Sequence, residues 1–231
     1  MAKNPLVIIV MGPPSSGKGT QAELLAEKFN LYHLETSEVI EQNLRNIKKG
    51  DFVRIAGKKY FLMEEKKKRE SGELMSSLLI AFWVKNKIKE VGGEGKGLVT
   101  SGAFRTLPET KELVPILKKF YGKENIKVIL LTLSDKEVIW RGTHRKTCEL
   151  MRHPILFTKE TERLKKCPFD GSRLLLRKDD NPEVIRVRLD EYRKDTLPSI
   201  EYLKKAGFKV IKINGSPPPA TIFKNILKAL K

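Results

Sequence analysis

The sequence lacks most of the features that mark secreted, membrane and fibrous proteins. Only two of its 231 residues are cysteine, Cys148 and Cys167, which excludes a disulfide framework and points to a reducing compartment or a metal site. No apolar run is long enough to span a bilayer and no signal-peptide pattern opens the chain. We therefore expect a soluble, cytoplasmic protein with no membrane partner.

Aromatic residues are also few, at 7% of the chain, and no nucleic-acid-binding motif stands out. Positive charge, in contrast, is plentiful, with a formal net charge of +18. Such a charge suits nucleic acid, an anionic membrane surface or small polyphosphates. Much of the excess is lysine mixed with glutamate, as in Glu64–Glu70, which is typical of a solvated helix face. Nucleic acid is therefore not the partner we expect, and it is kept only as an alternative.

Apolar runs alternate with helical patterns along the chain. Strands are predicted at Val7–Met11, Leu31–Leu34, Leu98–Thr100, Val128–Leu133 and Val210–Ile213. Helices are predicted at Thr20–Phe29, Ser37–Ile47, Leu74–Val91, Thr110–Tyr121, Lys136–Arg145, Pro182–Ala206 and Pro219–Leu230. This alternation predicts an α/β fold, a five-stranded parallel sheet with helices on both faces, in which ligands bind beyond the carboxyl ends of the strands.

Two segments interrupt the alternation. Residues 37–80 are polar and mostly helical, with short β-like pieces at Phe52–Ile55 and Tyr60–Leu62. Residues 146–178 contain both cysteines and few apolar side chains. Each segment is interpreted as an excursion from the sheet that could fold over a bound substrate.

A glycine-rich loop follows the first predicted strand and opens the first predicted helix. It runs from Gly12 to Thr20 and fits the pattern G-x-x-x-x-G-K, with the hydroxyl residue one place late. Glycines let successive N–H groups point at phosphate oxygens, the helix N-terminus adds partial positive charge, and Lys18 can reach the outer phosphates. An ordinary strand-to-helix turn would not need this combination. The residues expected to hold a nucleoside triphosphate are Gly12, Ser15, Ser16, Gly17, Lys18, Gly19 and Thr20.

Several motifs along the chain together resemble the adenylate kinases, the nucleoside monophosphate (NMP) kinases with a P-loop core. Gly12–Gln21 is similar to the family's GxPGxGKGTQ loop, Tyr32–Glu38 stands where the family has H-I-S-T-G-D, and Gly102–Thr106 where it has G-F-P-R-T. Arg141 and Arg145 match the arginine pair that opens the family's LID, the segment that covers ATP. The stretch Arg177–Glu183, with Arg188, Leu189 and Tyr192 after it, matches the LID exit.

The resemblance implies transfer of a phosphoryl group from ATP to AMP with Mg²⁺, by a chain expected to be a monomer. It implies a P-loop core at 1–36, 81–145 and 179–231, an NMP-binding lid at 37–80 and a LID at 146–178. Lys18, Arg141, Arg145, Arg177 and Arg188 would be catalytic, with Arg141 also on the ATP side. Phosphoryl transfer proceeds by positioning and charge neutralisation, for which guanidinium groups are suited. The acceptor site would comprise Thr36, Arg45, Gly102, Arg105, Glu109, Arg177 and Arg188.

The acceptor side departs from the family pattern at two charged positions. Glu41 stands where the family has a helix arginine, and Arg45, one turn on, could substitute for it or simply pair with Glu41. Ser101 replaces an aspartate that helps hold Mg²⁺, so the ion would rest on Thr20, ATP phosphates and water. Asp135 is a conceivable replacement, but it is expected to cap its helix.

The base-reading position also departs, because Glu109 stands where the family has a glutamine that reads adenine. A carboxylate only accepts hydrogen bonds and would suit guanine, whereas Thr36 at the family's adenine-contacting threonine favours AMP. GMP or another NMP therefore stays open as the acceptor. A nucleotide-binding or nucleic-acid-associated protein with weakened catalysis is a further alternative, which the retained arginines count against.

The predicted LID retains part of a zinc-binding pattern. Many family members bind structural zinc there through two C-x-x-C or C-x-x-D pairs. Here Met151 replaces the second cysteine of the first pair, whereas Cys167 and Asp170 keep the second pair. The resemblance therefore implies a zinc site formed by Cys148, His153, Cys167 and Asp170, all residue types that zinc accepts. The alternative is a LID held by hydrogen bonds and apolar packing alone.

Overall fold

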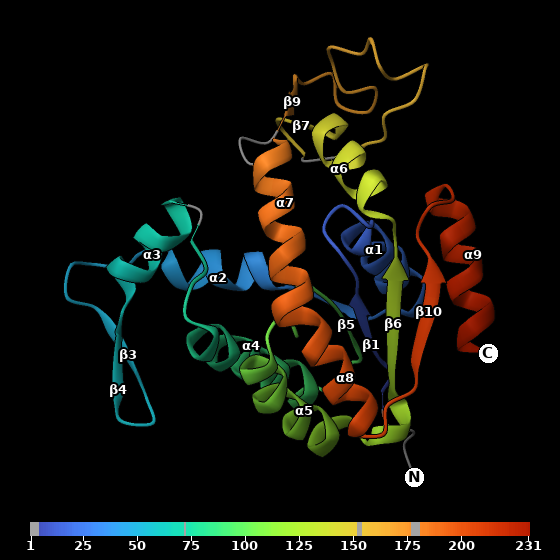
Figure 1. Ribbon diagram of the computed structural model, residues 1–231. Helices are drawn as coiled ribbons and strands as arrows, with labels where there is room; N and C mark the ends of the chain where they lie inside the picture. The colour runs from blue at the N-terminus through green and yellow to red at the C-terminus, as the bar shows by residue number, and fades with distance from the viewer. Residues whose placement is uncertain (1–4, 72, 152–153, 177–180) are drawn as a thin grey trace.

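The fold is built on a five-stranded parallel sheet in the order β10-β6-β1-β5-β2 (Figure 1). The computed structural model describes residues 5–71, 73–151, 154–176 and 181–231. The strands are β1 (Val7–Met11), β2 (Tyr32–Glu35), β5 (Leu98–Ser101), β6 (Ile126–Thr132) and β10 (Val210–Asn214). Each of them matches a predicted strand to within two residues at either end, so the predicted α/β fold class is confirmed.

Helices cover both faces of this sheet, which explains why the central strand β1 is apolar at every position and buried throughout. One face is covered by α1 (Lys18–Phe29) and α9 (Pro219–Leu230), whose Leu25 and Ile226 lie in the same core cluster as Ile8 of β1. The other face is covered by α4 (Ser77–Gly93), α5 (Leu107–Tyr121) and α8 (Leu197–Lys205). Within the described residues, no helix combines the length and apolar character needed to cross a bilayer.

The first excursion comprises α2 (Thr36–Leu44), the strands β3 (Phe52–Ile55) and β4 (Lys58–Phe61), and α3 (Leu62–Ser71). The two strands form an antiparallel hairpin whose turn has positive φ at Ala56 and Gly57. The predicted solvated face of Glu64–Glu70 is wrong at one position. Glu65 is buried, because its carboxylate accepts hydrogen bonds from Ser76 N, Ser76 Oγ and Lys68 Nζ, each at 2.7 Å.

The second excursion follows α6 (Asp135–His144) and contains three short strands in the order β8-β7-β9. These strands are β7 (Lys146–Cys148), β8 (Pro154–Ile155) and β9 (Leu174–Leu176). The buried side chains of this segment form a separate small cluster of Cys148, Ile155 and Cys167, with Leu174 packed against them. In Figure 1 the segment lies above the carboxyl ends of the sheet strands.

The predicted helix Pro182–Ala206 is divided into α7 (Pro182–Glu191), a π-helical turn at Tyr192–Thr196 and α8. Pro198 has no N–H group and cannot continue the regular hydrogen-bond ladder of an α-helix, which a π turn accommodates. The other predicted helices are confirmed, with ends shifted by three residues or fewer. A short 3₁₀ helix, η1 (Lys123–Asn125), precedes β6.

Candidate functional site

The glycine loop lies at the carboxyl end of β1 and runs into α1, as predicted. Gly12 has φ +149°, and a Cβ atom there would lie 2.7 Å from Leu131 O and 2.9 Å from Ser16 Oγ. Gly17 caps α1 in the left-handed conformation, with φ +86°. A side chain at Gly12 would collide with the neighbouring strand, so this close-fitting loop requires glycine there.

Lys18 begins α1 and meets two arginines from distant parts of the chain. Its Nζ donates a hydrogen bond to Pro13 O at 2.6 Å. Burial, followed by the positive charges of Arg105 and Arg145, lowers the pKa of Lys18 from 10.5 to about 7. Three cationic groups that destabilise one another in the free protein form a site prepared for a strongly anionic ligand.

Three of the predicted acceptor residues, Thr36, Gly102 and Arg105, also come together. A Cβ atom on Gly102, which has φ +88°, would lie 3.2 Å from Arg105 Nη2 and 3.7 Å from Thr36 Oγ1. The hydroxyls of Thr36 and Ser16 are buried, and within the described part of the chain neither has a hydrogen-bond partner. Buried polar groups are normally satisfied, so these two hydroxyls are available to a ligand.

Helix α6 rests directly on the glycine loop. A Cβ atom at Gly142 would lie 2.5 Å from Ile185 Cδ1 of α7 and 3.1 Å from Ser15 Oγ. Arg141, one residue earlier, does not point at Lys18. Its guanidinium donates to Gly215 O at 2.8 Å and Ser216 O at 2.7 Å, in the loop between β10 and α9.

The remaining predicted arginines are placed only in part. Arg188 is half-buried on α7, whereas Arg177 lies outside the described residues. Arg45 is exposed at the end of α2, and none of the ion pairs formed by the described residues joins it to Glu41. The structure therefore does not favour the simple pairing of Glu41 with Arg45.

Two residues near Ser101 were missed by the sequence analysis. His33 Nε2 lies 3.0 Å from Ser101 Oγ, and Glu35 stands beside Ser101 in the register of β2 and β5. Glu35 accepts a hydrogen bond from Ser37 Oγ at 2.6 Å. The carboxyl ends of adjacent parallel strands meet at one edge, and that signal could have identified Glu35 from the sequence, whereas the contact of His33 depends on the register of the two strands.

The prediction that Asp135 caps its helix is wrong. Ser134 is the capping residue of α6, and its Oγ accepts a hydrogen bond from Glu137 N at 3.3 Å. Asp135 instead forms an ion pair with Arg193. The side chain of Asp135 is thus engaged with the helix beyond the second excursion.

Glu109 lies at the start of α5, beside the loop Gly102–Thr106, which we call the acceptor loop. Its Oε1 accepts a hydrogen bond from Phe104 N and its Oε2 one from Arg105 N, both at 3.1 Å. Burial raises the pKa of Glu109 from 4.5 to about 7, although the backbone hydrogen bonds and Arg105 oppose the increase. Phe104 has φ +62°, an uncommon conformation for a bulky residue, and Glu109 holds this loop in place. The geometry favours a supporting role for Glu109 over contact with a base.

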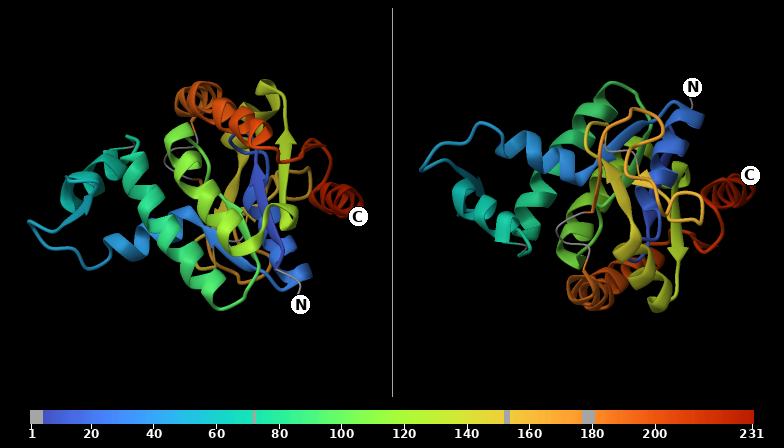
Figure 2. Two further views of the ribbon diagram at one scale, coloured as in Figure 1. Left: turned by 90° about the horizontal axis from the view of Figure 1, so that it is seen from below. Right: turned by 90° about the horizontal axis from the view of Figure 1, so that it is seen from above.

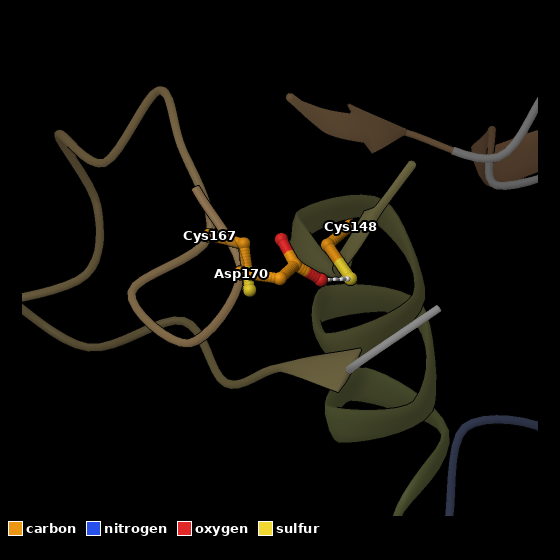
Figure 3. A group of neighbouring side chains, drawn as sticks. All are labelled: Cys148, Cys167 and Asp170. Atoms are coloured by element: carbon orange, nitrogen blue, oxygen red, sulfur yellow. Dashed lines mark hydrogen bonds between the residues drawn. The ribbon is translucent and has the colours of Figure 1, made fainter. Parts of the chain in front are cut away.

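The cysteines of the second excursion converge with Asp170 (Figure 3). One ligand atom from each of Cys148, Cys167 and Asp170 lies within 4.8 Å of the others. Cys148 Sγ donates to Asp170 Oδ2 at 3.0 Å, and Ser172 N donates to Oδ1 at 2.9 Å. Hydrogen bonds from Ser172 and Cys148 keep the pKa of Asp170 below its ordinary value.

Backbone hydrogen bonds shape the turn that holds two of these ligand residues. Gly171 N donates to Cys167 O at 2.9 Å, and Cys167 N donates to Ser172 O at 2.7 Å. Two thiols and a carboxylate suit a zinc ion, which takes sulfur and oxygen ligands in tetrahedral sites. The predicted fourth ligand, His153, lies outside the described residues.

Comparison with known proteins agrees with this geometry. The sequence model for adenylate kinases matches residues 10–208. An adenylate kinase of Methanothrix thermoacetophila is 33% identical over 224 residues, which cover 96% of this chain and 97% of the relative. Adenylate kinases of Chlamydia muridarum and Clostridium tetani are each 30% identical, over 100% and 96% of this chain and 89% and 97% of their own length.

Proposed function

The chain belongs to the adenylate kinase family of phosphotransferases, and from that premise we propose a direct transfer of the γ-phosphoryl group of ATP to AMP. A phosphate oxygen of AMP forms the new bond to the γ-phosphorus, the bond to the β,γ-bridging oxygen breaks, and two ADP molecules result. The observation that carries this proposal is the convergence of Lys18, Arg105 and Arg145 at the glycine loop. Such a cluster neutralises the charge of two polyphosphates held in line.

On the ATP side, the loop amides and Lys18 would hold the phosphates. Lys18 would follow the transferred group, and Arg145 would approach it from α6. We propose that Arg141, held against Gly215 and Ser216, lines the position of the ATP base and leaves the phosphates to the other arginines. The ATP-binding set then comprises Gly12, Ser15, Ser16, Gly17, Lys18, Gly19, Thr20 and Arg141.

On the acceptor side, Thr36 and Gly102 would line the pocket for the nucleoside, and Arg105 would hold its phosphate. We further propose that Arg45 supplies the cation that Glu41 does not, and that Arg188 and Arg177 approach the phosphates when the excursions close. The lid over the acceptor is residues 37–80 and the lid over ATP is residues 146–178. The core comprises residues 1–36, 81–145 and 179–231, in a single chain that works as a monomer.

Members of this family use Mg²⁺ with ATP. The oxygen donors that suit this hard cation are the Thr20 hydroxyl at the glycine loop and the Glu35 carboxylate at the same edge of the sheet as Ser101. Bound Mg²⁺ would neutralise phosphate charge. The proposal gives Glu35 the role of the missing aspartate, and Ser101 the role of orienting His33.

We also propose that the second excursion binds a structural zinc ion. Cys148, Cys167 and Asp170 would bind it, with His153 as the fourth ligand. The small cluster of buried side chains gives this segment little apolar core of its own, so a metal cross-link would stabilise it. Four protein ligands leave no position open for substrate, so the ion would have no part in the transfer.

The acceptor is tested by a coupled assay with Mg-ATP and each of AMP, GMP, CMP and UMP. AMP should be phosphorylated fastest, because Thr36 keeps the family's adenine contact and Glu109 is engaged with the acceptor loop. If GMP is preferred, and Glu109→Gln shifts the preference to AMP, Glu109 reads the base and the assignment of AMP is wrong. A folded protein that turns over none of the four would contradict catalysis itself.

The zinc proposal is tested by metal analysis of protein purified without chelator. About one zinc per chain is expected, with a sharp loss in Cys148→Ser and no loss in the control variant Lys159→Ala, which changes an exposed side chain of the same excursion. Metal-free protein with full activity and a protease-resistant second excursion would show that hydrogen bonds and packing suffice.

A further inference from the structure

The β3–β4 hairpin of the first excursion has two unlike faces. In an antiparallel pair, residues opposite each other project to the same side, and here Val53 pairs with Tyr60 and Phe52 with Phe61. Tyr60 is buried in the main core cluster, and Val53 and Ile55 pack against it. This inner face anchors the hairpin to the rest of the molecule.

The outer face consists of two aromatic and two cationic side chains. Phe52 and Phe61 are 43% and 42% exposed, with ring centroids 6.0 Å apart and planes inclined at 60°. Arg54 and Lys59, the next pair on the same side, are exposed as well, and Lys59 Nζ lies 4.4 Å from the centre of the Phe52 ring. The chain has few aromatic residues, yet the register of this hairpin places two of them side by side in solvent.

The charge of the hairpin has a single sign. Residues 52–61 contain no aspartate or glutamate, whereas they contain Arg54, Lys58 and Lys59. Lys48 and Lys49, exposed just before β3, add two further positive charges, and Asp51, which directly precedes Phe52, offsets one of them. Exposed rings beside unopposed cations are not needed for folding, because the inner face supplies the packing.

We propose that the outer face of the β3–β4 hairpin binds single-stranded nucleic acid, with bases stacked on Phe52 and Phe61 and phosphates contacted by Arg54 and Lys59. Aromatic rings bind any base through its π face, and a neighbouring cationic groove follows the backbone. The net charge of +18 attracts a polyanion to the molecule, and the hairpin is where that charge coincides with stacking surfaces.

Two other occupants fit the same face less well. A membrane-inserting hairpin would present large apolar side chains at its tip, but the tip here is Ala56 and Gly57 and both phenylalanines lie at the base. A second copy of the chain, packed face to face, would bring Arg54 and Lys59 against like charges. Nucleic acid is the occupant that uses both the rings and the cations.

This face belongs to the segment proposed as the acceptor lid but needs no part in phosphoryl transfer, so the inference goes beyond the proposed function and does not rest on it. The hairpin lies at one end of the molecule and α9 at the opposite end in both views of Figure 2, with the glycine loop and the sheet between them. Helix α9 therefore offers a matched control, because Lys224 and Lys228 are exposed on it.

The test measures binding of fluorescently labelled oligouridylate, about 12 nucleotides long, by anisotropy at low salt. The double variant Phe52→Ala/Phe61→Ala should weaken binding at least about tenfold, because base–aromatic stacking is lost while charge is unchanged. A labelled deoxyoligonucleotide of the same length should show the same loss. Unfolding midpoints near that of the wild type establish that the variants are folded.

The contribution of charge is tested with two variants that lose the same number of cations. Arg54→Gln/Lys59→Gln should weaken binding and lower the slope of log K against log salt by about 1.4, as two phosphate contacts on a single strand predict. Lys224→Gln/Lys228→Gln on α9 should leave affinity within about twofold of the wild type.

Four results would overturn the proposal. The first is no binding of either oligonucleotide, and the second is an equal loss in the hairpin and α9 variants, which would indicate diffuse charge. The third is that Phe52→Ala/Phe61→Ala loses binding to anionic phosphatidylserine vesicles but keeps its binding to oligonucleotide. The fourth is that the wild type sediments as a dimer, whereas this variant sediments as a monomer and binds oligonucleotide as the wild type does.

Discussion

The two excursions from the sheet are stabilised in different ways. Residues 37–80 contribute Val39, Ile40, Leu44, Tyr60, Leu62 and Met75 to the main core cluster, so this segment is continuous with the body of the protein. In the described part of residues 146–178, the buried apolar side chains belong to the separate cluster around Cys148, Ile155 and Cys167. The first segment is held by burial of apolar area, and the second by a few polar and sulfur atoms in one tight turn.

Because of this difference, a substitution in the first segment should change global stability, whereas one in the second should change local order. Removing an apolar side chain from the first segment leaves a cavity in the shared core, which the whole molecule must accommodate. Removing one from the second affects a unit that can open by itself, because few contacts connect it to the rest. In the function proposed above, both segments nevertheless serve one centre at the glycine loop.

The largest effect on turnover is expected from a substitution at that shared centre. Lys18→Ala should lower turnover about a hundredfold or more, because one preorganised donor to the transferred phosphoryl is lost. The measurement is the coupled assay with AMP. Lys28→Ala, exposed in the last turn of the same helix, is the control and should retain turnover. Near-normal turnover in folded Lys18→Ala would show that this loop is not the catalytic one.

The next prediction separates the two excursions directly. Leu62 and Ile155 are similarly buried, at 8% and 6% exposure. Leu62→Ala should lower the free energy of unfolding by about 2–4 kcal/mol, because it leaves a cavity in the shared core. Ile155→Ala should lower it by less than about 1 kcal/mol and instead speed proteolysis of residues 146–178. Urea denaturation and limited proteolysis measure the two effects, and equal losses of global stability would contradict the comparison.

Glu109, which supports the acceptor loop from the start of α5, gives a pH-dependent prediction. The folded state keeps a proton on Glu109 up to about pH 7, whereas the unfolded state releases it near the ordinary pKa of 4.5. Its contribution to stability is therefore complete below pH 4.5 and is lost as pH rises to 7, by up to about 3 kcal/mol. Unfolding free energies from pH 4.5 to 7 should fall less steeply in Glu109→Gln than in the wild type. Glu112→Gln, exposed on the same helix, should keep the wild-type slope.

The smallest expected effect concerns the acceptor. Arg45→Ala should raise the KM for AMP about tenfold and leave that for ATP nearly unchanged, if the exposed guanidinium reaches the acceptor phosphate. Lys49→Ala, in the same segment, is the matched control. Equal changes in both KM values, or none, would show that Arg45 does not replace the arginine missing at Glu41.

The sheet and the glycine loop could be predicted from the sequence because their signals are local. The β1 run is apolar at every position, and the Gly12 and Gly17 conformations follow from loop chemistry. The meeting of Lys18 with Arg105 and Arg145 followed from the family motifs alone, since no local pattern places residues so distant along the chain together.

Other features could not be predicted because they depend on tertiary contacts. From the sequence, Glu65 is expected on the surface, but hydrogen bonds from Ser76 satisfy its carboxylate in the interior. From the family motifs, Glu109 is expected to contact the base, but both its oxygens accept hydrogen bonds from the backbone N–H groups of Phe104 and Arg105. The partner of Ser101, His33, emerges only from the register of two strands.

The π-helical turn at Tyr192–Thr196 accommodates one residue more than an α-helical turn would. Thr196 is the last residue of the turn, and its Oγ1 donates a hydrogen bond to Arg105 O at 2.9 Å. This bond fixes the start of α8 against the acceptor loop. Each residue of an α-helix advances the side-chain direction by about 100°, whereas a π turn, with its longer hydrogen-bonded ring, holds more residues for the same rotation. Loss of one residue from the turn would therefore convert it to α-helix and leave α7 facing nearly the same way. Loss of one residue between Arg188 and the turn would instead rotate Arg188, and the second excursion beyond it, by about 100° around the helix axis.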